Sequence, residues 1–261
     1  MTALRVAALA VSAAAALAAA PAARATSVAN PIALHGVGQF ALAAETEHIE
    51  TNLFGAGIVS RRHVVKGIYR LNPWCDVFLR AGAGDIDVEG VAFGGPAELD
   101  GSPQFAWGGG VRMHAWRSES LPFSPRLVLA AEGLLYRSES AIERTLTFPG
   151  STLRQRYDAA YRWREFEGTA TVVLRWRSFF PYGGWAFRRV EGELRRSETE
   201  DNGTTTTVIS ASEDDFATDL RAYPLAGVDY AAGETFHISA QGFWRNERDY
   251  GLFFGISESS R

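Results

Sequence analysis

The stretch Lys66–Asp87, KGIYRLNPWCDVFLRAGAGDID, decides the fold class. It contains two segments in which polar and apolar residues alternate, separated by Leu71-Asn72-Pro73-Trp74, which we interpret as a tight turn. Alternation with a period of two places polar side chains on one face of a strand and apolar side chains on the other. In a soluble sheet the apolar face covers a core, whereas in a membrane-spanning barrel it faces lipid and the polar face lines the interior.

The same hairpin pattern recurs along the chain. It predicts about ten strands, with eight as the alternative, and an even number lets antiparallel strands close into a barrel without a free edge. The links after the second, fourth, sixth and eighth predicted strands are mostly short, whereas three others are interpreted as long exposed loops: Val88–Pro103, Glu139–Thr152 and Arg196–Asp215. We therefore expect an all-β, closed, antiparallel up-and-down transmembrane β-barrel with these loops outside the cell.

The first residues predict export. Arg5 is followed by an apolar run over Val6–Ala20 and then by Ala23-Arg24-Ala25, a pattern typical of a cleaved secretory signal peptide. The run is too short for a convincing spanning helix. We place cleavage after Ala25, so residues 1–25 are the expected signal peptide and residues 26–261 the barrel domain. The expected location is the bacterial outer membrane.

Charge and composition narrow the class of function. The 26 basic and 30 acidic residues give a net charge of −4, and the arginines are scattered through the strands, which argues against a nucleic-acid surface. Lys66 is the only lysine. Cys75 is the only cysteine, so no intramolecular disulfide is expected, and the five histidines show no metal-ligand spacing. We expect no cofactor and no bound metal.

Four hairpin phrases carry a family resemblance: KGIYRLNPWCDVFLRAGAG, FAWGGGVRMHAW, VLRWRSFFPYGGWAF and LAGVDYAAGETFHISAQGFW. Over roughly Gly57–Ile256 the chain resembles the small bacterial outer membrane protein β-barrel family, which includes OmpA-like and porin-family barrels. The resemblance implies insertion in the outer membrane with both termini in the periplasm. It also implies contact with outer-membrane lipid and lipopolysaccharide, and with the barrel assembly machinery. Such barrels usually finish on an aromatic residue, whereas here Phe254 is followed by further residues to Arg261.

The predicted inward face carries charged and polar residues throughout. Because an isolated charge inside a narrow barrel is very costly, these residues must pair and form hydrogen bonds. We interpret them as a polar core that fills and fixes the barrel, with a narrow pore that favours anions as the alternative. The predicted interior network consists of Arg62, Lys66, Arg70, Asp76, Arg80, Arg112, His114, Glu132, Arg175, Asp229, His237 and Gln241.

Aromatic residues near the predicted strand ends indicate girdles at the two membrane interfaces. The residues assigned to these girdles are Trp74, Trp107, Trp163, Trp176, Trp185, Trp244, Tyr69, Tyr161, Tyr182, Tyr230 and Tyr250.

Two residue pairs leave a hydrolase as a further alternative. His114 with Glu132, or His237 with Ser239, would support general-base chemistry if a nucleophile lay within reach. A histidine two residues from a serine is common on any polar strand face, so we assign no catalytic residue and expect a protein that is not an enzyme. The expected function is a structural or surface-interaction role for a monomer. A passive pore, a hydrolase and a soluble ligand-binding barrel, with apolar residues inside, remain the alternatives.

Overall fold

The computed structural model describes residues 37–53, 56–93, 95–149, 151–247 and 249–259, and the predicted signal peptide lies outside these ranges. Among the described residues, no helix is long and apolar enough to cross a membrane. The described strands are β1 (Phe40–Leu53), β2 (Ala56–Asn72), β3 (Cys75–Ala92), β4 (Gly95–Leu99), β5 (Gln104–Arg117), β6 (Arg126–Phe148), β7 (Ser151–Val173), β8 (Phe179–Asp201), β9 (Thr206–Ala217), β10 (Arg221–Ala231), β11 (Phe236–Asn246) and β12 (Asp249–Ser259).

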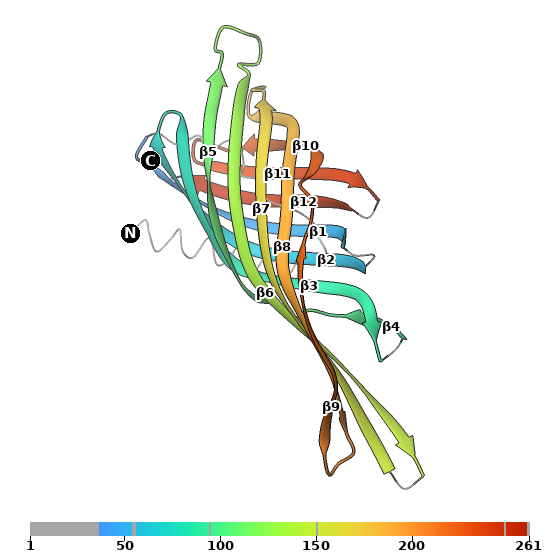
Figure 1. Ribbon diagram of the computed structural model, residues 1–261. Coiled ribbons are helices and arrows are strands. Elements are labelled where there is room, and N and C mark those ends of the chain that lie inside the picture. Colours follow the sequence, from blue (N-terminus) through green and yellow to red (C-terminus); the bar gives the residue numbers. More distant parts are fainter. Residues whose placement is uncertain (1–36, 54–55, 94, 150, 248, 260–261) are drawn as a thin grey trace, which may run out of the picture.

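Ten of these twelve strands form a closed ring. Their order is β10-β11-β12-β1-β2-β3-β5-β6-β7-β8, and pairing of β8 with β10 from Phe179↔Tyr230 to Arg188↔Arg221 closes it. Each neighbouring pair is antiparallel. The predicted closed, antiparallel up-and-down barrel of ten strands is therefore confirmed (Figure 1).

Side chains alternate between the two faces of the barrel wall. On β7, for example, Glu165 and Thr171 are buried, whereas Phe166 and Val172 are 49% and 47% exposed. This is the reverse of the arrangement expected for a soluble barrel with an apolar interior. Large apolar side chains face outward around the ring, including Val65, Tyr69, Leu79, Trp107, Val111, Met113, Leu129, Phe187, Leu252 and Phe254.

The three segments interpreted as loops contain paired strands instead. β3 continues to Ala92 and pairs with β4, and β6 pairs with β7 as far as Phe148↔Ser151. β8 exchanges partners along its length, because Phe179–Arg188 pairs with β10 and Glu191–Asp201 pairs with β9. The outer parts of β6, β7 and β8, together with β9, thus form an extension beyond one end of the ring (Figure 1). The sequence there is polar because both faces of much of this sheet meet water, as the almost fully exposed β9 illustrates.

Glycines allow neighbouring strands of the barrel wall to approach each other closely. A Cβ added at Gly108 of β5 would overlap the carbonyl oxygen of Gly133 on β6, and one at Gly110 would overlap that of Ala131. Neither position leaves room for a side chain, which explains the run Gly108-Gly109-Gly110 inside a strand.

Candidate functional site in the barrel interior

The lumen contains ion pairs that join strands on opposite walls. Arg62 of β2 donates from Nη2 to Glu165 Oε2 of β7 at 2.6 Å, and these strands lie four places apart in a ring of ten. The bond therefore crosses the interior. We call the connected set the central network; it consists of Glu45, Glu47, Arg62, Lys66, Arg80, Glu132, Glu165 and Arg188.

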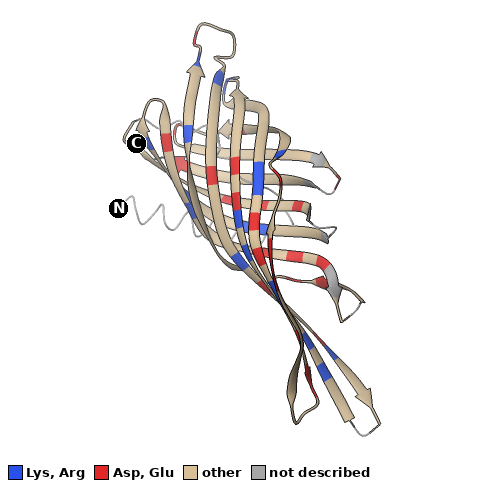
Figure 2. Cartoon of the chain, viewed as in Figure 1, with Lys and Arg blue, Asp and Glu red and all other residues tan. Residues whose placement is uncertain are grey.

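The central network is neutral and buried. Arg80 of β3 pairs with Glu132 of β6 at 2.7 Å and also with Glu47 of β1. Lys66 Nζ lies 3.0 Å from Glu45 Oε1, and both side chains are fully buried. Its four basic side chains face four carboxylates, and each of these side chains is at most 8% exposed. Because each buried charge of the central network has an opposite charge in contact, this network needs no counter-ion from solvent. Basic and acidic residues accordingly occur on neighbouring strands of the ring (Figure 2).

A second cluster surrounds Asp76 beside the β2–β3 turn. Asp76 Oδ1 accepts a hydrogen bond from Arg70 Nε at 2.7 Å, and its Oδ2 accepts one from Arg112 Nε at 2.8 Å. His114 Nε2 lies 3.1 Å from the same Oδ2. Within the described residues no hydrogen bond joins His114 to Glu132, so the first of the two hydrolase pairs is not assembled. The cluster instead ties β2, β3 and β5 together at this end of the barrel.

The opposite wall carries the other predicted interior residues. Asp229 of β10 and His237 and Gln241 of β11 are buried. Gln241 Oε1 accepts a hydrogen bond of 3.1 Å from the hydroxyl of Tyr182 on β8. The imidazole of His237 makes no hydrogen bond to another described residue, so it is not joined to Ser239 as a catalytic pair. Among the described residues, no three or more His, Cys, Asp or Glu side chains are arranged to hold a metal ion.

Arg175 is the exception among the twelve predicted interior residues, because it is exposed. β7 ends at Val173, and the chain then turns around Arg177, which has φ +56°. Trp176 and Phe179 exchange backbone hydrogen bonds of 2.8 and 2.9 Å across this turn. Strand alternation stops at Val173, so the assignment of Arg175 to the inward face is corrected.

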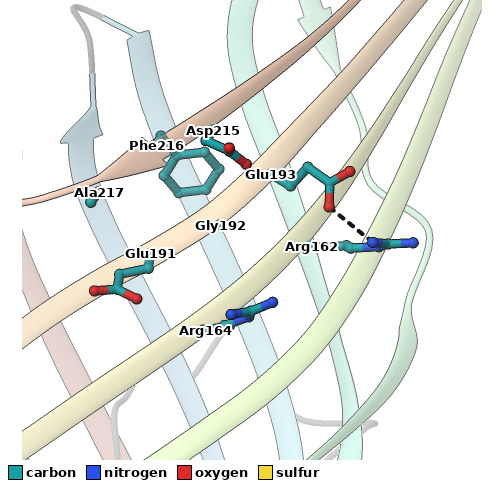
Figure 3. Close-up of a pocket in the computed structure, with 8 residues that line it drawn as sticks. All are labelled: Arg162, Arg164, Glu191, Gly192, Glu193, Asp215, Phe216 and Ala217. Carbon is teal, nitrogen blue, oxygen red and sulfur yellow. Dashed lines mark hydrogen bonds and ion pairs between the residues drawn. The ribbon is translucent and has the colours of Figure 1, made fainter.

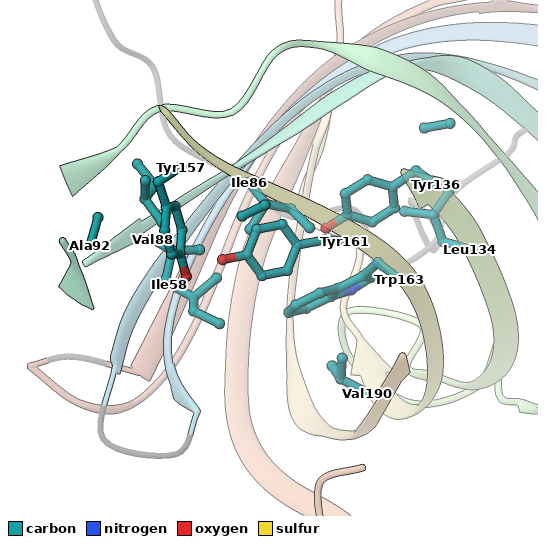
Figure 4. Packing of buried hydrophobic residues seen from close by; sticks show 13 residues of the cluster. Ile58, Ile86, Val88, Ala92, Leu134, Tyr136, Tyr157, Tyr161, Trp163 and Val190 are labelled. Carbon is teal, nitrogen blue, oxygen red and sulfur yellow. The ribbon is translucent and has the colours of Figure 1, made fainter. Parts of the chain in front are cut away.

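An apolar cluster of buried residues packs inside the barrel and continues toward the extension (Figure 4). Trp163 of β7 is 1% exposed, and its Nε1 donates a hydrogen bond of 3.2 Å to Glu165, which joins the cluster to the central network. The hydroxyl of Tyr136 accepts a bond of 3.1 Å from Arg62 and lies 2.9 Å from Ser60 Oγ. The buried members are Ile58, Ile86, Val88, Ala92, Leu99, Ala106, Leu134, Tyr136, Tyr157, Ala159, Tyr161, Trp163 and Val190.

Three residues assigned to the aromatic girdles lie inside the barrel. Trp163, Tyr161 and Tyr182 are buried, which corrects their assignment to the membrane interface. Tyr161 lies toward the extension, beyond the apolar outer band of β7, and burial raises the pKa of its hydroxyl to about 12. The large exposed girdle residues are Tyr69, Trp74, Trp107, Trp176, Trp185, Tyr230 and Trp244.

No family model and no curated protein sequence matches this chain. The solved structures that resemble it in three dimensions include the following three. The translocator domain of the autotransporter NalP from Neisseria meningitidis has 9% identity and a TM-score of 0.46, with coverage of 89% of this chain and 91% of that one. The outer membrane protease OmpT from Escherichia coli has 7% identity and a TM-score of 0.36, covering 85% and 93%. Ail of Yersinia pestis has 8% identity and a TM-score of 0.26, covering 85% and 97%. The barrel assignment rests on the closed ring of strands and not on these likenesses.

Sequence reasoning missed five charged residues of the interior. Glu45 and Glu47 of β1, Glu165 and Glu167 of β7 and Arg188 of β8 are all buried. Each pair of glutamates is spaced by two residues, which is the spacing of one strand face. Extending the inward face of each predicted strand to its full length would have found them. Without these residues the predicted interior had an excess of arginine, and this excess favoured the anion pore as an alternative.

Proposed function

We propose that this chain is an integral protein of the bacterial outer membrane, that its lumen is closed to solutes, and that it has a structural or surface-interaction role. The observation that carries this proposal is the bond between Arg62 and Glu165, which crosses the interior within a neutral network. In a soluble barrel, exposed Trp, Phe, Leu and Val side chains on the outer face would contact water, whereas in a membrane-inserted barrel they contact lipid.

The interior favours a filled barrel over a pore. An anion pore needs basic side chains that remain available to passing anions. Here Arg62, Arg80 and Arg188 each contact a carboxylate inside the lumen, and Trp163 packs with buried apolar neighbours toward the extension. Opening a path would break several buried ion pairs at once, and each break is costly.

The extension supports a role at the cell surface. The extension projects from one end of the ring, and the short β2–β3 and β7–β8 turns lie at the other end. Short turns lie on the periplasmic side of outer-membrane barrels. We therefore propose that β9 and the β6–β7 hairpin are outside the cell, in a monomer surrounded by outer-membrane lipid and inserted by the barrel assembly machinery.

Membrane fractionation followed by conductance measurements tests this proposal. We expect the native chain to require detergent for extraction, to change its gel mobility on boiling, and to give no steady conductance in planar bilayers. The variant R62A/R80A removes two cross-strand cations from the lumen and should give measurable conductance events. R154A, an exposed change in the β6–β7 hairpin, should stay silent.

Two results would contradict the proposal. Steady, anion-selective conductance by the unaltered chain would favour the pore. A native chain that remains soluble without detergent, with no mobility shift, would exclude a membrane-inserted barrel.

A further inference from the structure

Four arginines face outward at about the same level of three neighbouring strands, and we call them the arginine row: Arg137 of β6, Arg162 and Arg164 of β7, and Arg189 of β8. Arg137 lies directly opposite Arg162 in the β6–β7 register. All four side chains are exposed. Like charges directly opposite one another on adjacent strands are destabilising, so this arrangement needs negative charge nearby.

The chain supplies only part of that charge. Arg162 pairs with Glu193 at 2.9 Å, as the dashed line in Figure 3 shows, and Arg189 pairs with Glu191 at 2.7 Å. Arg137 and Arg164 form no ion pair or hydrogen bond with another side chain that the structure describes. They sit diagonally on adjacent strands, since Leu135 is the residue opposite Arg164. In the β7–β8 register Arg164 lies opposite Glu191, but the Glu191 carboxylate pairs with Arg189. Arg137 and Arg164 therefore keep their guanidinium groups available to an external anion.

The arginine row marks the level at which the apolar outer wall ends. The outward residues of β7 change from Val172, Ala170 and Phe166 to Arg164 within one alternation step. On β6 the change comes after Leu135, at Arg137. In a barrel surrounded by lipid, side chains directly beyond the apolar band lie among the headgroups.

An open hollow of about 610 Å³ connects the arginine row with the apolar wall. Its lining includes Phe105 and Trp107 of β5, which are 66% and 53% exposed. The full lining is Gln104, Phe105, Trp107, Leu135, Tyr136, Arg137, Arg162, Trp163 and Arg164. A lining that combines aromatic and aliphatic side chains with arginines matches a molecule that carries both acyl chains and phosphate.

We propose that the arginine row and this hollow form a binding site for a phosphorylated glycolipid of the outer leaflet. Arg137 and Arg164 bind its phosphate groups, because guanidinium donates paired hydrogen bonds to phosphate oxygens. Its acyl chains lie against Phe105 and Trp107, continuous with the lipid-facing wall. This site rests on the proposed outer-membrane location and assigns one face of the barrel to one lipid class.

Native mass spectrometry of the folded full chain in detergent tests the site. The probes are bisphosphorylated lipid A and the same lipid A with both phosphates removed. The double variant R137Q/R164Q should bind the phosphorylated probe about tenfold more weakly or worse, since it loses charge-assisted hydrogen bonds. R154Q is the matched control: Arg154 is exposed on the same outward face of β7, ten residues and about 33 Å from Arg164. It should bind like the unaltered chain.

The outcomes separate the site from the proposed function. Equal binding of phosphorylated lipid A by R137Q/R164Q and R154Q would overturn the site. So would equal binding of both probes by the unaltered chain, or displacement of lipid A by inorganic phosphate at a similar concentration. A chain that fractionates with membranes but gives any of these results loses the lipid site alone. A chain that is soluble without detergent fails the proposed function, whatever the lipid result.

Discussion

Replacing Arg62 by methionine should destabilise the barrel far more than replacing an exposed arginine. Arg62 forms ion pairs with Glu165 at 2.6 Å and with Glu47 at 3.3 Å, and its side chain is 1% exposed. Removing one partner of a buried ion pair costs about 3–5 kcal/mol. Glu165 keeps Arg188 at 2.9 Å, and Glu47 keeps Arg80, so the lower end applies. We expect a loss of about 3 kcal/mol, which is more than a hundredfold in the unfolding equilibrium constant.

Urea unfolding of the protein in phospholipid vesicles, followed by tryptophan fluorescence, measures this loss. R117M is the matched control, because Arg117 pairs with Glu119 at 2.7 Å while both side chains are more than half exposed. This exposed pair should contribute less than about 1 kcal/mol. The double variant R62M/E165Q should be less unstable than the two single changes added together, because their effects couple through one contact.

Equal, small losses for R62M and R117M would refute the reasoning. They would mean that water reaches the Arg62–Glu165 pair and screens it, as in a hydrated pore. Strictly additive effects in R62M/E165Q would likewise show that the two side chains do not interact across the lumen.

Two further predictions concern the extension. Burial raises the pKa of Tyr161 to about 12, above the usual value of about 10, so the neutral hydroxyl stabilises the folded chain below pH 10 and this stabilisation is lost as the pH rises toward 12. In urea titrations between pH 8 and pH 12, Y161F should therefore lose less stability than the unaltered chain. An identical loss in both proteins would contradict the burial of this hydroxyl. A peptide epitope inserted between Asn202 and Gly203, in the β8–β9 turn, should bind antibody on intact cells. The same epitope inserted between Ser120 and Leu121, in the β5–β6 turn, should bind antibody only after the outer membrane is permeabilised. The opposite result would reverse the proposed orientation of the barrel in the membrane.

Much of the fold was predictable because a barrel strand carries its own signature. The alternation in Lys66–Asp87 specifies which face of β2 and β3 points out of the barrel, and the tight turn between them specifies antiparallel pairing. The same rule, carried backward from Ala170 and Val172 along β7, assigns Tyr161 and Trp163 to the interior. Their aromatic character suggested a membrane girdle, and strand alternation outweighs residue type in deciding the face.

The rest required information that is not local. Polar composition in Arg196–Asp215 is shared by loops and by strands that meet water on both faces, so β9 was not predictable from residue type. Likewise, nothing in the sequence specifies that Arg62 meets Glu165, because these residues are 103 positions apart and come together only when the ring closes. The interior residue types were accessible from alternation, whereas their partners depend on the size of the barrel.

The burial of Lys66 gives the chain an unusual chemical profile. It is the only lysine in the sequence, and its amine is sealed inside the lumen against Glu45. Apart from the chain's own amino terminus, the folded protein therefore offers no primary amine to succinimidyl esters or aldehydes. The unfolded chain also exposes the amine of Lys66 to these reagents. Modification of Lys66 by an amine-reactive reagent consequently reports unfolded molecules. Lysine-directed crosslinking or conjugation will leave the folded protein unmodified at this residue until a lysine is introduced on its surface.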